Sequence, residues 1–172
     1  EDSFSANFNI LVAGQPRVMG VREILQEWTA WRTECVRRRL YFQMNKKKDK
    51  LHLLKGLGKI LLDIDKAIRI IRETELDAEV VPNLMIGFGI DQVQAEYVAE
   101  IRLRNINKEF LLNRLQETES LEREIAELEE LLGSEKKIKA VICKELDAVS
   151  SKYGQPRKTQ LVYDHEPVSY TH

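Results

Sequence analysis

Apolar residues recur at alternating intervals of three and four positions over two long stretches of the chain. In the first stretch, this repeat comprises Leu54, Leu57, Leu61, Ile64, Ile68 and Ile71. Such spacing is typical of the seam along which helices pack in a coiled coil. There is no proline between Gly20 and Pro82, so one uninterrupted helix from Val21 to about Glu73 is allowed. We therefore expect residues 21–76 to form a single outbound coiled-coil helix.

The second repeat follows Asn107, a residue type suited to cap a helix N-terminus. Its apolar positions are Leu111, Leu115, Leu121, Ile125, Leu128 and Leu132. Gly133 and Ser134 then divide the segment, because glycine is common just after a helix and serine just before one. Residues 108–154 match the outbound helix in length, so we expect them to return along it as an antiparallel hairpin. We interpret Gly133 and Ser134 as a hinge that lies opposite the polar stretch 45–50.

Between the two long segments, the helical pattern breaks into short pieces. Gly87 and Gly89 predict the end of one helix, and Asp91 with Gln94 predicts the start of another as a capping box. We expect residues 77–107 to form a small helical head at the tip of the hairpin.

The two ends of the chain have a different pattern. Residues 1–20 contain two short apolar runs separated by Gly14, Gln15 and Pro16, which predict a β-hairpin. Residues 155–172 are expected to be a tail or linker. The expected fold class is thus all-α: a long antiparallel coiled-coil hairpin with a small head and an N-terminal β-hairpin. The first residue, Glu1, suggests that the chain was cut from a longer protein.

The formal net charge of the chain is only -1, so the distribution of charge along the chain matters more than its total. A nearly neutral chain has no overall attraction to nucleic acid, so any such binding depends on local patches. The densest patch comprises Arg37, Arg38, Arg39, Lys46, Lys47, Lys48 and Lys50. Two interpretations stay open. The residues form either a solvated helix face that pairs with acids of the returning helices, or a wall that tolerates DNA phosphates without reading bases.

Several kinds of chemical site are not predicted. Cys35 and Cys143 are isolated, and the three histidines are scattered, so we expect neither a metal site nor a disulfide. The segment 55–59 contains two glycines but lacks the spacing of a phosphate-binding loop, and we interpret Gly56 and Gly58 as points of close helix approach or flexibility. No apolar run is long enough to span a membrane, so we expect a cytoplasmic protein without a membrane partner.

Residues 11–25, Leu-Val-Ala-Gly-Gln-Pro-Arg-Val-Met-Gly-Val-Arg-Glu-Ile-Leu, resemble a segment in the A subunit of DNA gyrase, where the chain leaves the tower domain and enters the coiled coil. Segments 51–57, 101–106, 132–134 and 152–159 resemble later landmarks of this bacterial type IIA topoisomerase family, in the same order and spacing. The resemblance covers nearly the whole chain. The A subunit of the related topoisomerase IV shares this architecture and stays an alternative, although the hairpin residues favour gyrase.

The sequence departs from the family pattern at three places. Lys55 stands where the family usually has Glu, Pro82 interrupts a head helix, and residues 107–109 replace a turn of the Thr-Gly-Leu-Glu type. These departures bear on the details of the head. A second alternative comes from a different class of protein, a structural coiled-coil dimerisation module that never meets DNA.

The resemblance implies that two copies of the chain meet at the head and form an exit gate for a transported DNA duplex. The interface residues expected on this basis are Val98, Ile101, Arg102, Leu103 and Ile106. The same resemblance favours a DNA-facing role for the basic patch at 37–50. It also implies that the joint at Gly133 and Ser134 flexes when the heads separate.

The resemblance further implies that the parent protein is an ATP-dependent DNA topoisomerase. ATP and magnesium would belong to a partner chain, the B subunit of gyrase in an A2B2 complex, so no cofactor is expected in this chain. Cleavage in the family uses a tyrosine in an Arg-Tyr-Thr context. None of the tyrosines has that context, so we expect no catalytic residue here; they are Tyr41, Tyr97, Tyr153, Tyr163 and Tyr170.

Overall fold

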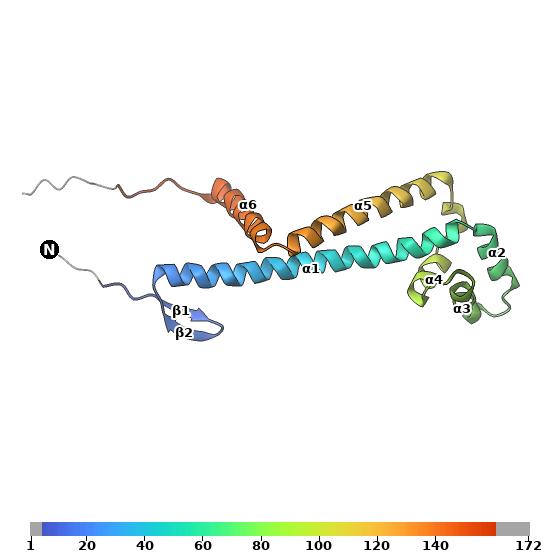
Figure 1. The fold of residues 1–172 in the computed structure, drawn as a ribbon, viewed down its shortest axis with the longest axis horizontal. Coiled ribbons are helices and arrows are strands. Elements are labelled where there is room, and N and C mark those ends of the chain that lie inside the picture. The colour runs from blue at the N-terminus through green and yellow to red at the C-terminus, as the bar shows by residue number, and fades with distance from the viewer. Residues whose placement is uncertain (1–4, 161–172) are drawn as a thin grey trace, which may run out of the picture.

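The computed structural model describes residues 5–160, and Figure 1 shows one long helix with two helices returning along it. The elements are β1 (Asn9–Val12), β2 (Gln15–Val18), α1 (Val21–Leu61), α2 (Ile64–Glu73), α3 (Asp77–Phe88), α4 (Gln92–Ala99), a 3-10 turn η1 (Leu103–Asn105), α5 (Lys108–Leu132) and α6 (Glu135–Tyr153). The predicted helical hairpin with a terminal head and an N-terminal β-hairpin is confirmed. Most of the predicted tail, at 161–172, lies outside the described residues, as do residues 1–4.

The outbound segment is not one helix, contrary to expectation. Helix α1 ends at Leu61, and Asp63 begins α2 by accepting a hydrogen bond from the backbone N–H of Lys66 at 3.1 Å. An aspartate that caps a new helix stops the old one, because its carboxylate satisfies backbone donors that have no partner inside the new helix. Helix α2 then turns and packs against α3. As a consequence, Ile68 and Ile71 are 44% and 45% exposed instead of lying in the arm seam.

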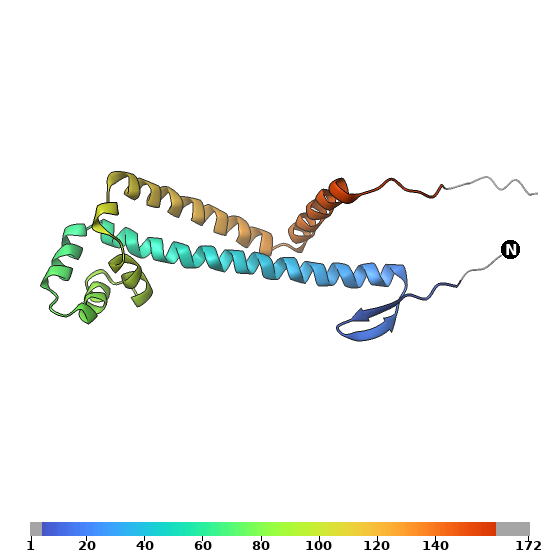
Figure 2. The same ribbon diagram turned by 180° about the vertical axis from the view of Figure 1, so that it is seen from behind.

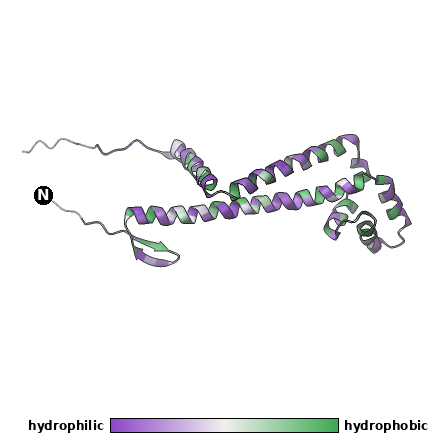
Figure 3. Ribbon diagram, viewed as in Figure 1, coloured by the Kyte–Doolittle hydropathy of each residue, from purple (hydrophilic) through white to green (hydrophobic). Residues whose placement is uncertain are grey.

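Three apolar clusters follow one another along the molecule. They comprise Val36, Leu40, Ile138 and Ile142 at the base; Leu54, Leu57 and Leu121 in the arm; and Ile60, Ala67, Leu84, Ile90 and Ala95 in the head. Figure 3 shows the matching alternation of apolar and polar residues along both arm helices. Each cluster is small, so each section of the molecule depends mainly on its own contacts.

The joint between α5 and α6 lies at Gly133 and Ser134, and Figures 1 and 2 show α6 leaving the axis of α5 there. Its level along α1 differs from the prediction. Residues 45–50 face the middle of α5, where Lys47 contacts Glu124. The joint lies nearer the base, because Leu131 and Leu132, directly before it, pack against the cluster that contains Val36 and Leu40.

The head is stabilised where its helices begin and end. The predicted capping box at the start of α4 is confirmed, since Asp91 and Gln94 satisfy each other's backbone N–H. Gly89 ends α3 in the left-handed region, with φ of 60°. Lys66 donates to the carbonyl of Gly87 at 2.6 Å, which places a cation at the negative end of α3.

The N-terminal hairpin is a tight one. Strands β1 and β2 pair antiparallel, with Asn9 opposite Val18 and Val12 opposite Gln15. The two turn residues, Ala13 and Gly14, have φ of 50° and 78°, as a two-residue turn that matches the strand twist requires. Within residues 5–160, no helix is long and apolar enough to cross a lipid bilayer.

Candidate functional site

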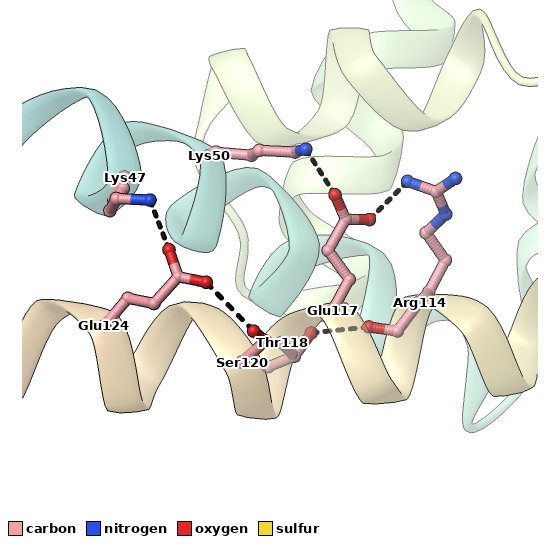
Figure 4. A network of polar contacts seen from close by, with 7 residues as sticks. All are labelled: Lys47, Lys50, Arg114, Glu117, Thr118, Ser120 and Glu124. Atoms are coloured by element: carbon pink, nitrogen blue, oxygen red, sulfur yellow. Dashed lines mark hydrogen bonds and ion pairs between the residues drawn. The ribbon is translucent and has the colours of Figure 1, made fainter. Parts of the chain in front are cut away.

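Two lysines of the predicted basic patch reach carboxylates of α5, as Figure 4 shows. Lys47 contacts Glu124, which also accepts a hydrogen bond from the Ser120 hydroxyl at 3.0 Å. Lys50 contacts Glu117 in the same way. Hydrogen bonds from Lys47 and then Ser120 hold the pKa of Glu124 below its usual value. Glu124 is therefore ionised at neutral pH and neutralises Lys47.

Three further members of the patch have a carboxylate partner. The pairs are Lys48 with Glu129 at 2.6 Å, Arg37 with Glu34 at 3.5 Å, and Arg39 with Glu145. Glu145 also pairs with Arg32 at 2.7 Å. The structure thus brings most of the basic patch together with acids, largely those of the returning helices.

Arg38 and Lys46 form no ion pair within the described residues. Arg38 contacts the Cys35 sulfur at 3.5 Å, and the Lys46 ammonium lies 5.6 Å from the centre of the Phe42 ring. Both cations are exposed on α1. Their charge is the part of the patch that the returning helices leave available.

The head residues expected to form a dimer interface are only partly accessible. Val98 packs against the clusters of both head and arm, and Ile101 packs against the arm cluster. Ile106 is half-buried, whereas Arg102 is exposed and Leu103 is 72% exposed. Val98 and Ile101 turn inward because the small head and arm need them to bury their apolar clusters. Among the predicted apolar set, Leu103 alone is largely exposed.

A more accessible apolar surface lies where α1 ends and α5 begins. A groove there is lined by residues of both helices, including Leu61, Leu62, Leu111 and Leu115. Leu62, at the helix break, is 88% exposed, Leu115 is 58% exposed and Leu111 is 37% exposed. Sequence reasoning assigned Leu111 and Leu115 to the seam, so it missed this groove. The sequence signal that could have located the groove is Asp63, a helix-capping residue that ends α1 and begins α2.

Arg114 lines the groove with a polar group. Its guanidinium donates to Glu117 at 2.6 Å and lies 5.1 Å from the centre of the Phe110 ring. The planar side chain is therefore fixed on both sides, by a carboxylate and by an aromatic face. The tip of the arm thus carries a mostly apolar groove beside the head.

A protein-family model for the A subunit of DNA gyrase and topoisomerase IV matches residues 1–147. The chain belongs to this A-subunit family. The A subunit of DNA topoisomerase 4 from Salmonella typhimurium is 39% identical over 162 residues, which cover 94% of this chain and 21% of that protein. The A subunit of DNA gyrase from Clostridium acetobutylicum is 35% identical over 162 residues, covering 94% of this chain and 19% of that protein.

A third relative, the A subunit of DNA gyrase from Leptospira biflexa, is 31% identical over 159 residues, which cover 92% of this chain and 19% of that protein. The chain spans about a fifth of the length of these A-subunit relatives. Proteins of both names match, so the preference for gyrase over topoisomerase IV stays a prediction. Membership in the A-subunit family does not favour the alternative of a structural module unrelated to topoisomerases.

Proposed function

We propose that this chain is the arm and exit gate of the DNA-cleaving A subunit of a bacterial type IIA topoisomerase, with gyrase as the first choice. The observation that carries the proposal is the combination of A-subunit family membership with a long hairpin that bears an apolar groove and a head at its tip. The parent enzyme would be an ATP-dependent topoisomerase whose nucleotide and magnesium lie on the B subunit. This chain would supply no catalytic residue.

The gate itself would be a homodimer, in which the tips of two arms meet. A two-fold axis places the same patch of both copies in contact, so a self-complementary apolar surface is required. The groove of Leu62, Leu111 and Leu115 meets this requirement better than Val98 and Ile101, which pack within their own chain. Burial of one large exposed apolar side chain stabilises a complex by about 1.5–3 kcal/mol. Leu103 and Arg102 are accessible and would extend the contact at the head.

The arm would border the path of a passing duplex without holding it tightly. Five of the seven cations of the patch are neutralised by carboxylates. Arg38 and Lys46 remain, within the described residues, for weak contact with phosphates. Such a surface suits a channel through which DNA has to pass, because tight binding would retain it. The joint at Gly133 and Ser134 would flex as the tips separate.

Solution mass as a function of concentration tests the proposed gate. The expected species is a dimer of twice the chain mass of 20.0 kDa, measured by sedimentation or light scattering. Leu115→Glu places a charge in the groove and is expected to yield monomers, because an unpaired buried charge is costly. Leu112→Glu is the matched control, since Leu112 is 56% exposed on the same helix but outside the groove lining.

Two outcomes would contradict the placement of the gate. One is a chain that stays monomeric at every concentration, and the other is a Leu112→Glu variant that dissociates as readily as Leu115→Glu. Circular dichroism of both variants checks that the helices are intact. An Ile101→Glu variant tests separately the interface expected from the sequence. Because Ile101 is half-buried, this substitution is also expected to lower the folding stability of the chain.

A further inference from the structure

The arm and the head are joined through a buried glutamine. Gln94 of α4 is only 6% exposed, and its side-chain amide donates to the backbone carbonyl of His52 at 2.7 Å. Gly56, one turn further along α1, lies against the same side chain. A Cβ atom at position 56 would approach the Gln94 Cβ to 2.6 Å, which is closer than side chains tolerate. Helix α4 can therefore reach α1 only because residue 56 has no side chain.

The side chain of His52 makes a second connection to α4. Its Nε2 contacts one carboxylate oxygen of Asp91, and its Nδ1 lies 3.4 Å from the Gln94 amide nitrogen. The other Asp91 oxygen accepts a hydrogen bond from the backbone N–H of Gln94 at 2.9 Å. One carboxylate thus begins a helix of the head and binds the arm at the same time.

We propose that His52, Asp91 and Gln94 form a proton-controlled clasp that fixes the angle between head and arm. The neutral imidazole can already donate its Nε2–H to the ionised Asp91 carboxylate, and protonation turns this hydrogen bond into an ion pair, which adds the attraction between opposite charges. Protonation also removes Nδ1 as an acceptor for the Gln94 amide. That contact is long at 3.4 Å, and the amide keeps its shorter bond to the His52 carbonyl, so the gain at Asp91 outweighs the loss.

The charged groups around His52 come from two helices. Its helical neighbours on α1 are Lys48, Asp49 and Lys55, and the facing charged group on α4 is Asp91. The two lysines are engaged by Glu129 and Glu122 of α5.

The backbone N–H of Gln94, followed by the His52 side chain, lowers the pKa of Asp91 below its usual value. Asp91 therefore stays ionised across the range of about pH 5–8 in which histidine ordinarily changes charge. Across that range the clasp is strongest at the acidic end and weakens as the pH rises.

The consequence of the clasp rests on the proposed function. A head held at one angle presents Leu103 and the neighbouring groove to a second copy in one orientation, whereas a loosened head presents them in several. The clasp would thus make closure of the gate more favourable at lower pH.

Distances between nitroxide labels, measured by pulsed electron resonance, test the clasp within one chain. The labels are attached through Asn45→Cys on α1 and Glu79→Cys on α3, in a full chain that also carries Cys35→Ser and Cys143→Ser. Unlabelled chain is added in excess so that only distances within one chain are observed. We expect a narrow distance distribution at about pH 6 and a broader one at about pH 8, following the charge of the imidazole.

Two variants and one control make the result decisive. His52→Gln keeps a hydrogen-bonding amide without a titrating proton, and Asp91→Asn keeps a good helix cap without the charge. Both are expected to show the same broad distribution at the two pH values. A double variant, His165→Gln with His172→Gln, removes the other histidines of the chain and is expected to respond like the parent.

A parent distribution that does not change with pH would overturn the clasp, and so would a change that persists in both His52→Gln and Asp91→Asn. The same labels are also placed in the Leu115→Glu background, which is expected to be monomeric, so that the distances report on the clasp without dimerisation. A failure of the clasp is therefore distinguishable from a failure of the proposed gate, which the solution mass reports.

Discussion

Gly56 and Gly58 lie two positions apart on α1, and their surroundings differ completely. A Cβ at Gly56 would meet the Gln94 side chain at 2.6 Å, whereas a Cβ at Gly58 would meet nothing within 4 Å. Sequence reasoning could only treat the two glycines alike, as sites of close approach or of flexibility. The first role belongs to Gly56, because α4 crosses α1 at that position and not one half-turn later.

At the residue scale, this difference predicts opposite effects of the same substitution. Gly56→Ala is expected to destabilise the protein by about 1–3 kcal/mol, because the added methyl overpacks the contact with α4. Gly58→Ala is expected to stabilise it by about 0.5–1 kcal/mol, because alanine is a better helix former and has free space there. Urea unfolding followed by circular dichroism measures both. Equal effects of the two substitutions would show that position 56 is not the point of contact.

At the element scale, the ion pairs between α1 and the returning helices have one polarity. In the described pairs, the cation lies on α1 and the carboxylate on α5 or α6, as in Lys47 with Glu124 and Arg39 with Glu145. This arrangement favours pairing of α1 with the returning helices over pairing of α1 with another α1, where cation would face cation.

The contacts of Glu145 allow a prediction of how strongly the docking of α6 on α1 depends on these ion pairs. Burial raises its pKa, but hydrogen bonds from Arg39 and Arg32 outweigh that effect, and the net pKa lies below the usual value. A carboxyl whose pKa is lowered by folding contributes stability at neutral pH and loses it as the pH falls through the folded pKa. Glu145→Gln should therefore destabilise the docking of α6 at pH 7 by at most about 1 kcal/mol, since the pairs are partly exposed.

Hydrogen exchange of α6 amides measures this loss at neutral pH. Asp147→Asn is the matched control, because Asp147 is an exposed carboxylate on α6 that makes no ion pair within the described residues. In acid, below the pKa of Glu145, the parent and the Glu145→Gln variant should become equal in stability. A variant that differs from the parent as much in acid as at neutral pH would contradict the role of these ion pairs.

At the scale of the whole molecule, the separate apolar clusters predict local rather than uniform responses to mutation. Leu84 in the head and Ile138 at the base are both 0% exposed, but they belong to different clusters. Leu84→Ala is expected to cost about 2–5 kcal/mol and to raise hydrogen exchange in α3 and α4, because the cavity is confined to the head. Ile138→Ala should raise exchange in α6 and leave the head protected. Matching exchange patterns in the two variants would mean that the molecule opens as one unit.

The sequence by itself determined the local structure of this protein. Asp91 and Asn107 begin helices where they were predicted to, because a cap acts through backbone groups within a few residues of itself. The Gly133–Ser134 joint also divides the returning helices where predicted, although the Ser134 side chain makes no cap hydrogen bond. The three-four repeat at Leu54, Leu57 and Leu121 likewise identified residues that are buried in the arm.

Only the tertiary structure decided which partner each face meets. The same repeat continues through Ile68 and Ile71, yet the break at Asp63 turns them away from the arm seam and leaves them 44% and 45% exposed on α2. The basic patch could have faced DNA or acids, and carboxylates far along the chain, on α5 and α6, pair with most of it. A periodic pattern fixes which side of a helix is apolar, but the element that packs there is set by contacts between distant parts of the chain.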